Sequence, residues 1–424
     1  MPSEPLRVLV VGGGIGGLCL AQGLKKAGVS VAVYERDRSP AGRLGGFRIH
    51  INPDGSGALH ECLPPAAWEA FVSTAGEPGG LGFLTEELEE LTVIEEESAR
   101  PGAEDPAGRS HAADRVTLRQ VLLTDLEDVL HFGKEFERYE RSPGGEVIAH
   151  FADGTSATGD VLVGADGANS RVREQHLPRA RKVETGATGI GLKLPLTDRT
   201  RGWLPPRILA GMNMVIAPAP YFLFTSVFER RADPADTSRG PGLQAVFGDG
   251  DRGYQDYVLC AFVARRDALP PGVRDLDGPG LMRVVGAKIE HWHPDLRRLV
   301  AEADPDSAWV GPHVASVPVS PWGSTNVTLL GDAIHAMPPV GGLGGNTALR
   351  DARLLCRTMG TVQRGEAPTV SAVRAYEAEM LDYGFAAVRT ALRYQRQGLR
   401  SSRVATAGAR TWFRTLDAVS SLRR

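Results

Sequence analysis

The fold of this chain follows from one run, LGDAIHAMPPVGGLGGN, at residues 330–346. The run begins at the end of an apolar segment, residues 327–330, which predicts a strand, and precedes a helix-like segment, residues 347–359. Asp332 comes directly after the strand, and a Pro-Pro and glycine loop leads to the helix. Glycines admit a ligand close to the backbone, and helix N-terminal N–H groups attract anions. With Asn346 as a capping residue, the run predicts a site for a flat anionic ligand.

The N-terminus carries a second nucleotide-binding pattern. Its parts are an apolar strand at residues 8–11, the glycines Gly12, Gly14 and Gly17, a helix-like segment at 18–27, and a strand at 29–34 that ends at Glu35. This order is the dinucleotide-binding pattern, in which the glycines allow a tight turn, the approach of a pyrophosphate and close helix packing. We expect Glu35 to bind the ribose hydroxyls.

Two further segments point to the same kind of site. Residues 161–173 form an apolar strand that runs into Asp166-Gly167, a turn dipeptide. A strand that ends in an ordinary turn has the same composition, so this segment alone is compatible with either a structural turn or a ligand site. Residues 116–122 predict a helix that carries Arg119, which by itself is an ordinary solvated charge.

Together these motifs resemble those of the class A FAD-dependent monooxygenases, the para-hydroxybenzoate hydroxylase type. The resemblance covers residues 6–357 and is greatest to compact members that tailor or inactivate polyketide antibiotics. It implies non-covalent FAD as the cofactor and NADPH or NADH as a transient reductant. The cofactor contacts that it implies are Gly12, Gly14, Gly17, Glu35, Arg36, Arg43, Arg119, Asp166, Gly331, Asp332, Pro339, Gly342, Gly344 and Asn346.

The resemblance also implies a reaction. FAD is reduced, O2 adds to it as a flavin C4a-hydroperoxide, and one oxygen is transferred to an electron-rich aromatic or polyketide-like small molecule by hydroxylation or epoxidation. Two alternatives remain open: an FAD-bearing cyclase of natural-product biosynthesis whose flavin is structural, and a flavin-binding protein without turnover.

The expected fold class is α/β. A Rossmann-type FAD-binding domain is assembled from residues 1–75, 105–180 and 300–365. A substrate domain from residues 76–104 and 181–299 forms an antiparallel sheet that covers the flavin ring, because strand-like runs recur there. These runs lie at residues 189–194, 212–217, 221–228, 243–247 and 257–263. Residues 366–424 form a C-terminal helical segment, expected to pack on the body.

Substrate contacts are expected from the strand at residues 47–52, which a turn at residues 53–55 follows. Arg48 and His50 alternate onto one face and are the candidate substrate-side residues. A half-exposed strand with outward polar residues explains them equally well. Met212, Met214, Tyr221, Phe222 and Phe224 are candidates for a pocket lining or for core. No catalytic acid or base is identified.

Composition agrees with an enzyme that binds small molecules. The net charge of −3 over 424 residues gives no drive toward nucleic acid. No apolar run is long enough for stable membrane insertion, and the N-terminus lacks a signal-peptide pattern, so a cytoplasmic location is expected. The four cysteines are scattered without metal-ligand spacing, so no metal is expected. Only six of the 48 basic residues are lysines, at 25, 26, 134, 182, 193 and 288.

Overall fold

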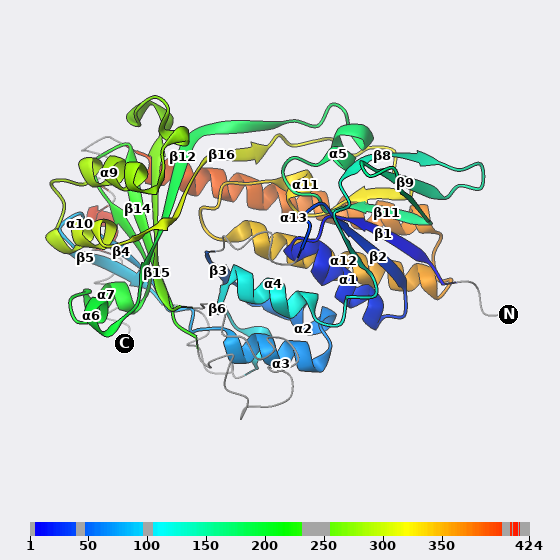
Figure 1. The fold of residues 1–424 in the computed structure, drawn as a ribbon, viewed down its shortest axis with the longest axis horizontal. Coiled ribbons are helices and arrows are strands. Elements are labelled where there is room, and N and C mark those ends of the chain that lie inside the picture. Colours follow the sequence, from blue (N-terminus) through cyan, green and yellow to red (C-terminus); the bar gives the residue numbers. More distant parts are fainter. Residues whose placement is uncertain are drawn as a thin grey trace.

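The computed structural model describes residues 5–39, 47–95, 105–230 and 255–400, with a few positions between 408 and 415. Arg43 and the strand expected at residues 243–247 lie outside the described residues. Two sheets organise the molecule, with the long helix α13 (Thr369–Gly398) running beside both (Figure 1).

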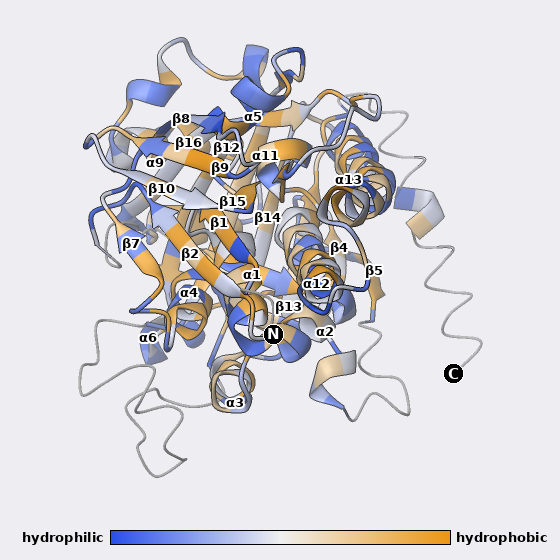
Figure 2. Cartoon of the chain, turned by 90° about the vertical axis from the view of Figure 1, so that its right-hand side faces the viewer, coloured by the Kyte–Doolittle hydropathy of each residue, from blue (hydrophilic) through white to orange (hydrophobic). Residues whose placement is uncertain are grey.

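The first sheet is parallel and has the strand order β17-β11-β1-β2-β7. Its strands are β1 (Arg7–Val11), β2 (Ser30–Glu35), β7 (Leu130–Phe132), β11 (Val161–Gly164) and β17 (Val327–Leu329). Its central strands consist mostly of buried aliphatic residues, as expected for a parallel sheet covered on both faces. Figure 2 shows this apolar character in β1 and β2, and helix α1 (Ile15–Lys26) beside α12 (Leu343–Gln363). The Rossmann-type arrangement is confirmed.

The second sheet has the order β16-β12-β15-β14-β13-β4-β5. Its strands are β4 (Gly80–Leu84), β5 (Glu90–Ile94), β12 (Lys182–Pro195), β13 (Gly211–Ile216), β14 (Tyr221–Phe228), β15 (Tyr257–Arg265) and β16 (Asp304–Ser316). All neighbours are antiparallel except β13 and β4. The predicted antiparallel sheet is therefore confirmed. The long β12 and β16 extend from it toward the parallel sheet (Figure 1).

The two faces of the second sheet have different partners because side chains alternate along each strand. Its outer face packs against α9 (Gly278–Lys288) and α10 (Pro294–Ala301) through residues such as Ile190 and Phe262. Its inner face carries Phe222 and Phe224 and turns toward the parallel-sheet side of the molecule. Tyr221 lies on the outer face, where its hydroxyl donates to Lys288 O at 2.9 Å, so it is not a pocket residue of the inner face.

The remaining elements connect or cover these sheets. They are α2 (Pro53–Cys62), α3 (Pro65–Thr74), α4 (Arg115–Leu123), α5 (Arg171–His176), α6 (Asp198–Arg201), α7 (Pro206–Leu209), α11 (Asp332–His335), β3 (Arg48–Ile51), β6 (His111–Asp114), β8 (Phe136–Arg141), β9 (Val147–Phe151) and β10 (Ser156–Gly159). Strand β3 pairs with β6. The C-terminal helix α13 packs on the body, as predicted, through buried residues that include Tyr376, Met380 and Phe385.

Two local predictions were wrong. Residues 53–55 do not form a turn, because Pro53 begins α2 and the Asn52 side chain caps that helix by accepting from Gly55 N at 2.9 Å. Proline is favoured at the first helical position, where its missing N–H costs nothing. Helix α12 begins at Leu343 and not at residue 347, so Gly344 and Gly345 already belong to its first turn.

Candidate functional site

The glycine turn after β1 leaves open space in front of the backbone. Gly12 has φ +110°, and a Cβ there would lie 2.3 Å from Ala165 O. A Cβ at Gly17 would lie 2.1 Å from Gly12 O, so this glycine lets α1 pack on the turn. A Cβ at Gly14 would meet no described atom within 4 Å. Gly14 therefore faces a hollow, as expected for the glycine that a pyrophosphate approaches.

Glu35 is held against this turn. It is the last residue of β2, and its buried carboxylate accepts from Gly13 N at 2.7 Å and from Asp37 N at 2.9 Å. The acid that ends the second strand therefore lies beside the glycines, where a ribose would lie next to its pyrophosphate. Arg36 follows it on the surface.

Asp332 lies beside the first turn of α12, because a Cβ at Gly344 would lie 3.8 Å from its Oδ1. It is the first residue of α11 and follows Gly331, whose φ of +65° turns the chain after β17. Its side chain is exposed, yet surrounding protein raises the pKa of its carboxyl by desolvation, against the opposing charges of His335 and Arg115.

The loop before α12 is fixed by Asn346. Its Nδ2 donates to His50 O at 2.7 Å and to Gly342 O at 2.8 Å, while its Oδ1 accepts from Asn52 N at 2.9 Å. The predicted capping role was wrong, because the residue at the N-cap is Gly342, with φ +64°. Asn346 instead joins the loop to β3. Pro339 is exposed at the loop, and a Cβ at Gly345 would meet no described atom within 4 Å.

Strand β3 carries the two substrate-side candidates, and His50 lies next to this loop. A Cβ at Gly342 would lie 3.4 Å from His50 Cβ. Burial, with the neighbouring Arg48 and His111, lowers the pKa of His50 to about 4, so its imidazole is neutral near pH 7. Arg48 is buried, and its Nη2 donates to Pro78 O at 2.7 Å.

Asp166 has a clear structural role. One carboxylate oxygen accepts from the N–H groups of Arg171, at 2.8 Å, and Val172, at 3.2 Å, at the start of α5. Burial raises the pKa of the Asp166 carboxyl. Its other oxygen is buried and has no hydrogen-bond partner among the described residues. That oxygen can still accept a ligand.

Helix α4 contributes an arginine that the sequence analysis did not single out. The charge of Arg115 acts on Asp332, and Arg119 lies one turn further along the same helix face. The sequence could have indicated Arg115, because it lies four residues before Arg119 and residues four apart on a helix are neighbours. Asp114 positions this helix by capping its N-terminus, accepting from Val116 N at 2.9 Å and Thr117 N at 3.1 Å.

A buried network behind the loop was also not predicted. Asp351 of α12 accepts from Gly331 N at 2.7 Å and from the Tyr383 hydroxyl at 2.6 Å, and one of its oxygens lies 2.7 Å from His335 Nε2. Both members of the His335–Asp351 pair are fully buried. Burial alone would lower the pKa of His335, but Asp351 and Asp332 raise it above its ordinary value. The network ties α13 to the turn that carries Asp332.

These residues form a cradle that fits FAD. The N-cap residues of helices α1 and α12 are both glycines, Gly14 and Gly342, and neither N-terminus has a side-chain cap among the described residues. Their N–H groups are therefore available to a phosphate or an anionic ring. The carboxylates of Glu35 and Asp332 are of the type that accepts hydrogen bonds from sugar hydroxyls.

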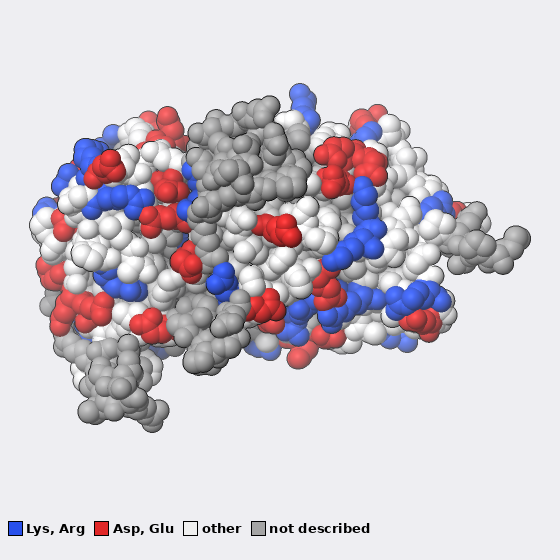
Figure 3. Space-filling view, turned by 90° about the horizontal axis from the view of Figure 1, so that it is seen from below, with Lys and Arg blue, Asp and Glu red and all other residues white. Residues whose placement is uncertain are grey.

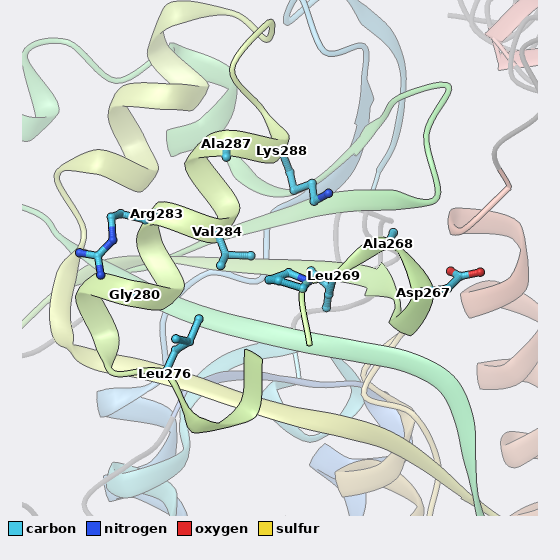
Figure 4. Close-up of a pocket in the computed structure, with 10 residues that line it drawn as sticks. Asp267, Ala268, Leu269, Leu276, Gly280, Arg283, Val284, Ala287 and Lys288 are labelled. Carbon is cyan, nitrogen blue, oxygen red and sulfur yellow. The ribbon is translucent and has the colours of Figure 1, made fainter. Parts of the chain in front are cut away.

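Two hollows lie away from these residues, near the end of β15. A cavity of about 600 Å³ is lined by Leu269, Leu276 and Val284 between α9 and the segment after β15 (Figure 4). A neighbouring groove of about 1250 Å³ reaches Gln395 and Leu399 at the end of α13. Helix α9 covers the outer face of the second sheet, so that sheet separates the cavity from the cradle.

Other classes of ligand would require particular groupings of side chains. Acidic and basic side chains are interspersed on the face seen in Figure 3. Within the described ranges, no group of three or more His, Cys, Asp or Glu residues could hold a metal ion. In the same part of the chain, none of the helices combines the length and apolarity that crossing a membrane would require.

Known proteins are similar to this chain in both sequence and architecture. A family profile described as FAD binding domain matches residues 291–391, and one described as NAD(P)-binding Rossmann-like domain matches residues 10–71. A solved structure from Photorhabdus luminescens, described as a FAD containing monooxygenase, is 32% identical with a TM-score of 0.82. The match covers 93% of this chain and 98% of that structure's chain.

Two curated proteins extend the comparison. A dual O-methyltransferase/FAD-dependent monooxygenase of Phaeosphaeria nodorum is 32% identical over 375 residues, which are 82% of this chain and 40% of that protein. This chain thus spans about four-tenths of the length of that relative. The aurachin C monooxygenase/isomerase of Stigmatella aurantiaca is 29% identical over 386 residues, 88% of this chain and 84% of that protein. With the cradle formed by Gly14, Glu35 and Asp332, these similarities show that the chain belongs to the class A FAD-dependent monooxygenases.

Proposed function

We propose that this protein uses NADPH or NADH and O2 to hydroxylate or epoxidise an electron-rich aromatic or polyketide-like small molecule, with FAD as its cofactor. One observation carries the proposal: the apolar inner face of the second sheet meets both the cradle loop and the start of β3. Val340 of the loop packs with Phe222 and Val263 of the sheet. Phe47, next to β3, packs with the cluster that contains Leu259.

The chain's own residues would bind the cofactor and exclude water. When bound, FAD supplies acceptance of a hydride and activation of O2. Glu35 would hold the ribose, and the N-terminus of α12 would stabilise negative charge on the ring next to it. The apolar inner face would shield the reacting atoms from solvent. The cofactor contacts implied by the resemblance belong to this proposal, together with Arg115.

Arg48 and His50 have different properties on the substrate side. His50, with its pKa of about 4, offers a neutral imidazole that can donate or accept one hydrogen bond. Arg48 is permanently charged, and its bond to Pro78 O fixes where that charge lies. We propose that both orient the substrate. We also propose residues 76–104 and 181–299 as the substrate domain, with β16 completing its sheet.

The decisive experiment loads purified protein with FAD and supplies NADPH or NADH, labelled O2 and a series of phenolic polyketides. We expect denaturation to release one non-covalent FAD per chain. A substrate should stimulate oxidation of the reductant and acquire labelled oxygen. A cyclase would instead form product without consuming reductant or incorporating label. A flavin-binding protein without turnover would form no product and consume no reductant.

Variants of β3 test the substrate side separately. Arg48→Ala and His50→Ala should reduce substrate-stimulated oxidation of the reductant while FAD stays bound. His291→Ala is the matched control, because the His291 side chain is 91% exposed. If both β3 variants keep wild-type substrate affinity and coupling, the strand is structural.

A further inference from the structure

A single lysine lies on the inner face of the second sheet. Along β12, Gly189, Gly191 and Lys193 share one face because side chains alternate. Its cross-strand partners are Leu259 on β15, a member of the inner-face apolar cluster, and Asp304 on β16. Lys193 therefore enters the interface between the sheet and the segment that begins β3.

Two aromatic rings hold its ammonium group. Lys193 Nζ lies 4.3 Å from the centroid of the Tyr257 ring and 5.4 Å from that of the Phe47 ring. Both distances are within the range of cation–π attraction. Among the described residues, no oxygen or nitrogen forms a hydrogen bond or ion pair with this ammonium group. Three N–H donors are thus held in a defined place and are available to a ligand.

The two carboxylates whose charges act on Lys193 each accept a hydrogen bond from another group. Asp114 accepts the Tyr257 hydroxyl at 2.9 Å and also caps α4. Asp304 accepts from Asp306 N at 3.0 Å. Burial lowers the pKa of Lys193, although the charges of Asp114 and Asp304 oppose that shift.

Asp114 and Asp304 keep their negative charges, but among the described residues neither carboxylate forms an ion pair with the Lys193 ammonium group. Arg48 is a second cation whose charge acts on the Tyr257 ring that Lys193 contacts. A partly buried cation without a paired anion is unfavourable, and a bound anion relieves that cost.

We propose that Lys193 binds an anionic oxygen of the substrate, a phenolate, enolate or carboxylate, and so selects acidic aromatic or enolic molecules. The inference rests on the proposed function, because it names the substrate class of that same pocket. The rings of Phe47 and Tyr257 provide flat apolar surfaces next to the cation, which suits an aromatic acid. A neutral molecule of equal size would leave the ammonium unpaired.

The test compares one charged probe with its neutral counterpart. FAD-loaded wild-type protein is titrated with salicylate and with methyl salicylate, and binding is followed through the flavin absorbance spectrum. We expect the dissociation constant for salicylate to be lower by about tenfold or more, as a hydrogen bond to a charged group provides. Lys193→Met should abolish this preference, and Lys193→Arg should restore part of it.

Lys288→Met is the control, because Lys288 belongs to α9 on the outer side of the sheet. It should keep the wild-type preference. Lys193→Gln replaces the Met variant if thermal unfolding or FAD content shows that the Met variant does not fold. The inference is overturned if wild type shows no preference for salicylate, including by binding neither probe, or if the preference survives removal of the charge. Reductant oxidation and oxygen incorporation, measured on the same preparations, decide the proposed function independently.

Discussion

Replacing Asp351 by Asn removes the charge from a fully buried carboxylate that connects three elements. It accepts from Gly331 N and the Tyr383 hydroxyl and pairs with His335. An amide of the same shape keeps one acceptor and presents an NH2 group where an acceptor stood. We therefore expect the turn that carries Asp332 to lose its support and FAD affinity to fall with stability.

The magnitude follows from the contacts. Hydrogen bonds to a charged acceptor contribute about 1.5–3 kcal/mol each, and neutral ones about 1 kcal/mol. Weakening three such bonds costs about 3 kcal/mol, near the lower end of the roughly 3–5 kcal/mol for breaking a buried ion pair. Asp382→Asn on α13 is the matched control, because Asp382 is exposed and should change stability by no more than about 0.5 kcal/mol.

Urea unfolding followed by tryptophan fluorescence measures the difference. A loss below about 1 kcal/mol in Asp351→Asn would refute the reasoning. The pH dependence gives a second check, because the pKa of His335 is raised in the folded state. Its stabilisation is fully present below the unfolded pKa of about 6.5 and is lost as the pH rises through the folded pKa. The wild-type free energy of unfolding should decline over that window, and the Asp351→Asn variant should lack that part of the decline.

Three further outcomes are expected. Gly14→Val should leave unfolding nearly unchanged but weaken FAD binding about tenfold in a fluorescence titration of the apoprotein. Gly17→Ala should instead lower the melting temperature, because its Cβ would lie 2.1 Å from Gly12 O. Equal behaviour of the two variants would contradict this. Glu35→Ala should weaken FAD binding by about 1.5–3 kcal/mol, and an unchanged dissociation constant would make Glu35 a purely structural acid. Because the pKa of His50 is about 4, His50→Gln should leave the shape of the pH–rate profile between about pH 6 and 8 unchanged. A lost inflection in that range would show that His50 titrates there.

The sequence by itself determined the elements whose geometry is local. Gly12 and Gly17 must be glycines because a Cβ would collide with neighbouring backbone, and that constraint acts within one strand-turn-helix unit. Glu35 ends a strand next to this unit, so its position follows from the pairing of two adjacent parallel strands. The same holds for Asp332 after β17. Such positions can be predicted because chain connectivity and strand pairing fix them.

Only the tertiary structure decided the contacts between distant segments. Asn346 has the composition of a helix cap, yet packing against β3 gives it three partners that connect strand and loop. The sequence around Lys193 does not distinguish it from other lysines, and only the folded sheet places its ammonium group beside the rings of Tyr257 and Phe47. Asp351 is polar on a buried helix face, and its partners His335 and Tyr383 come from other helices. No local pattern encodes these pairings, because they depend on which surfaces pack together to bury apolar area.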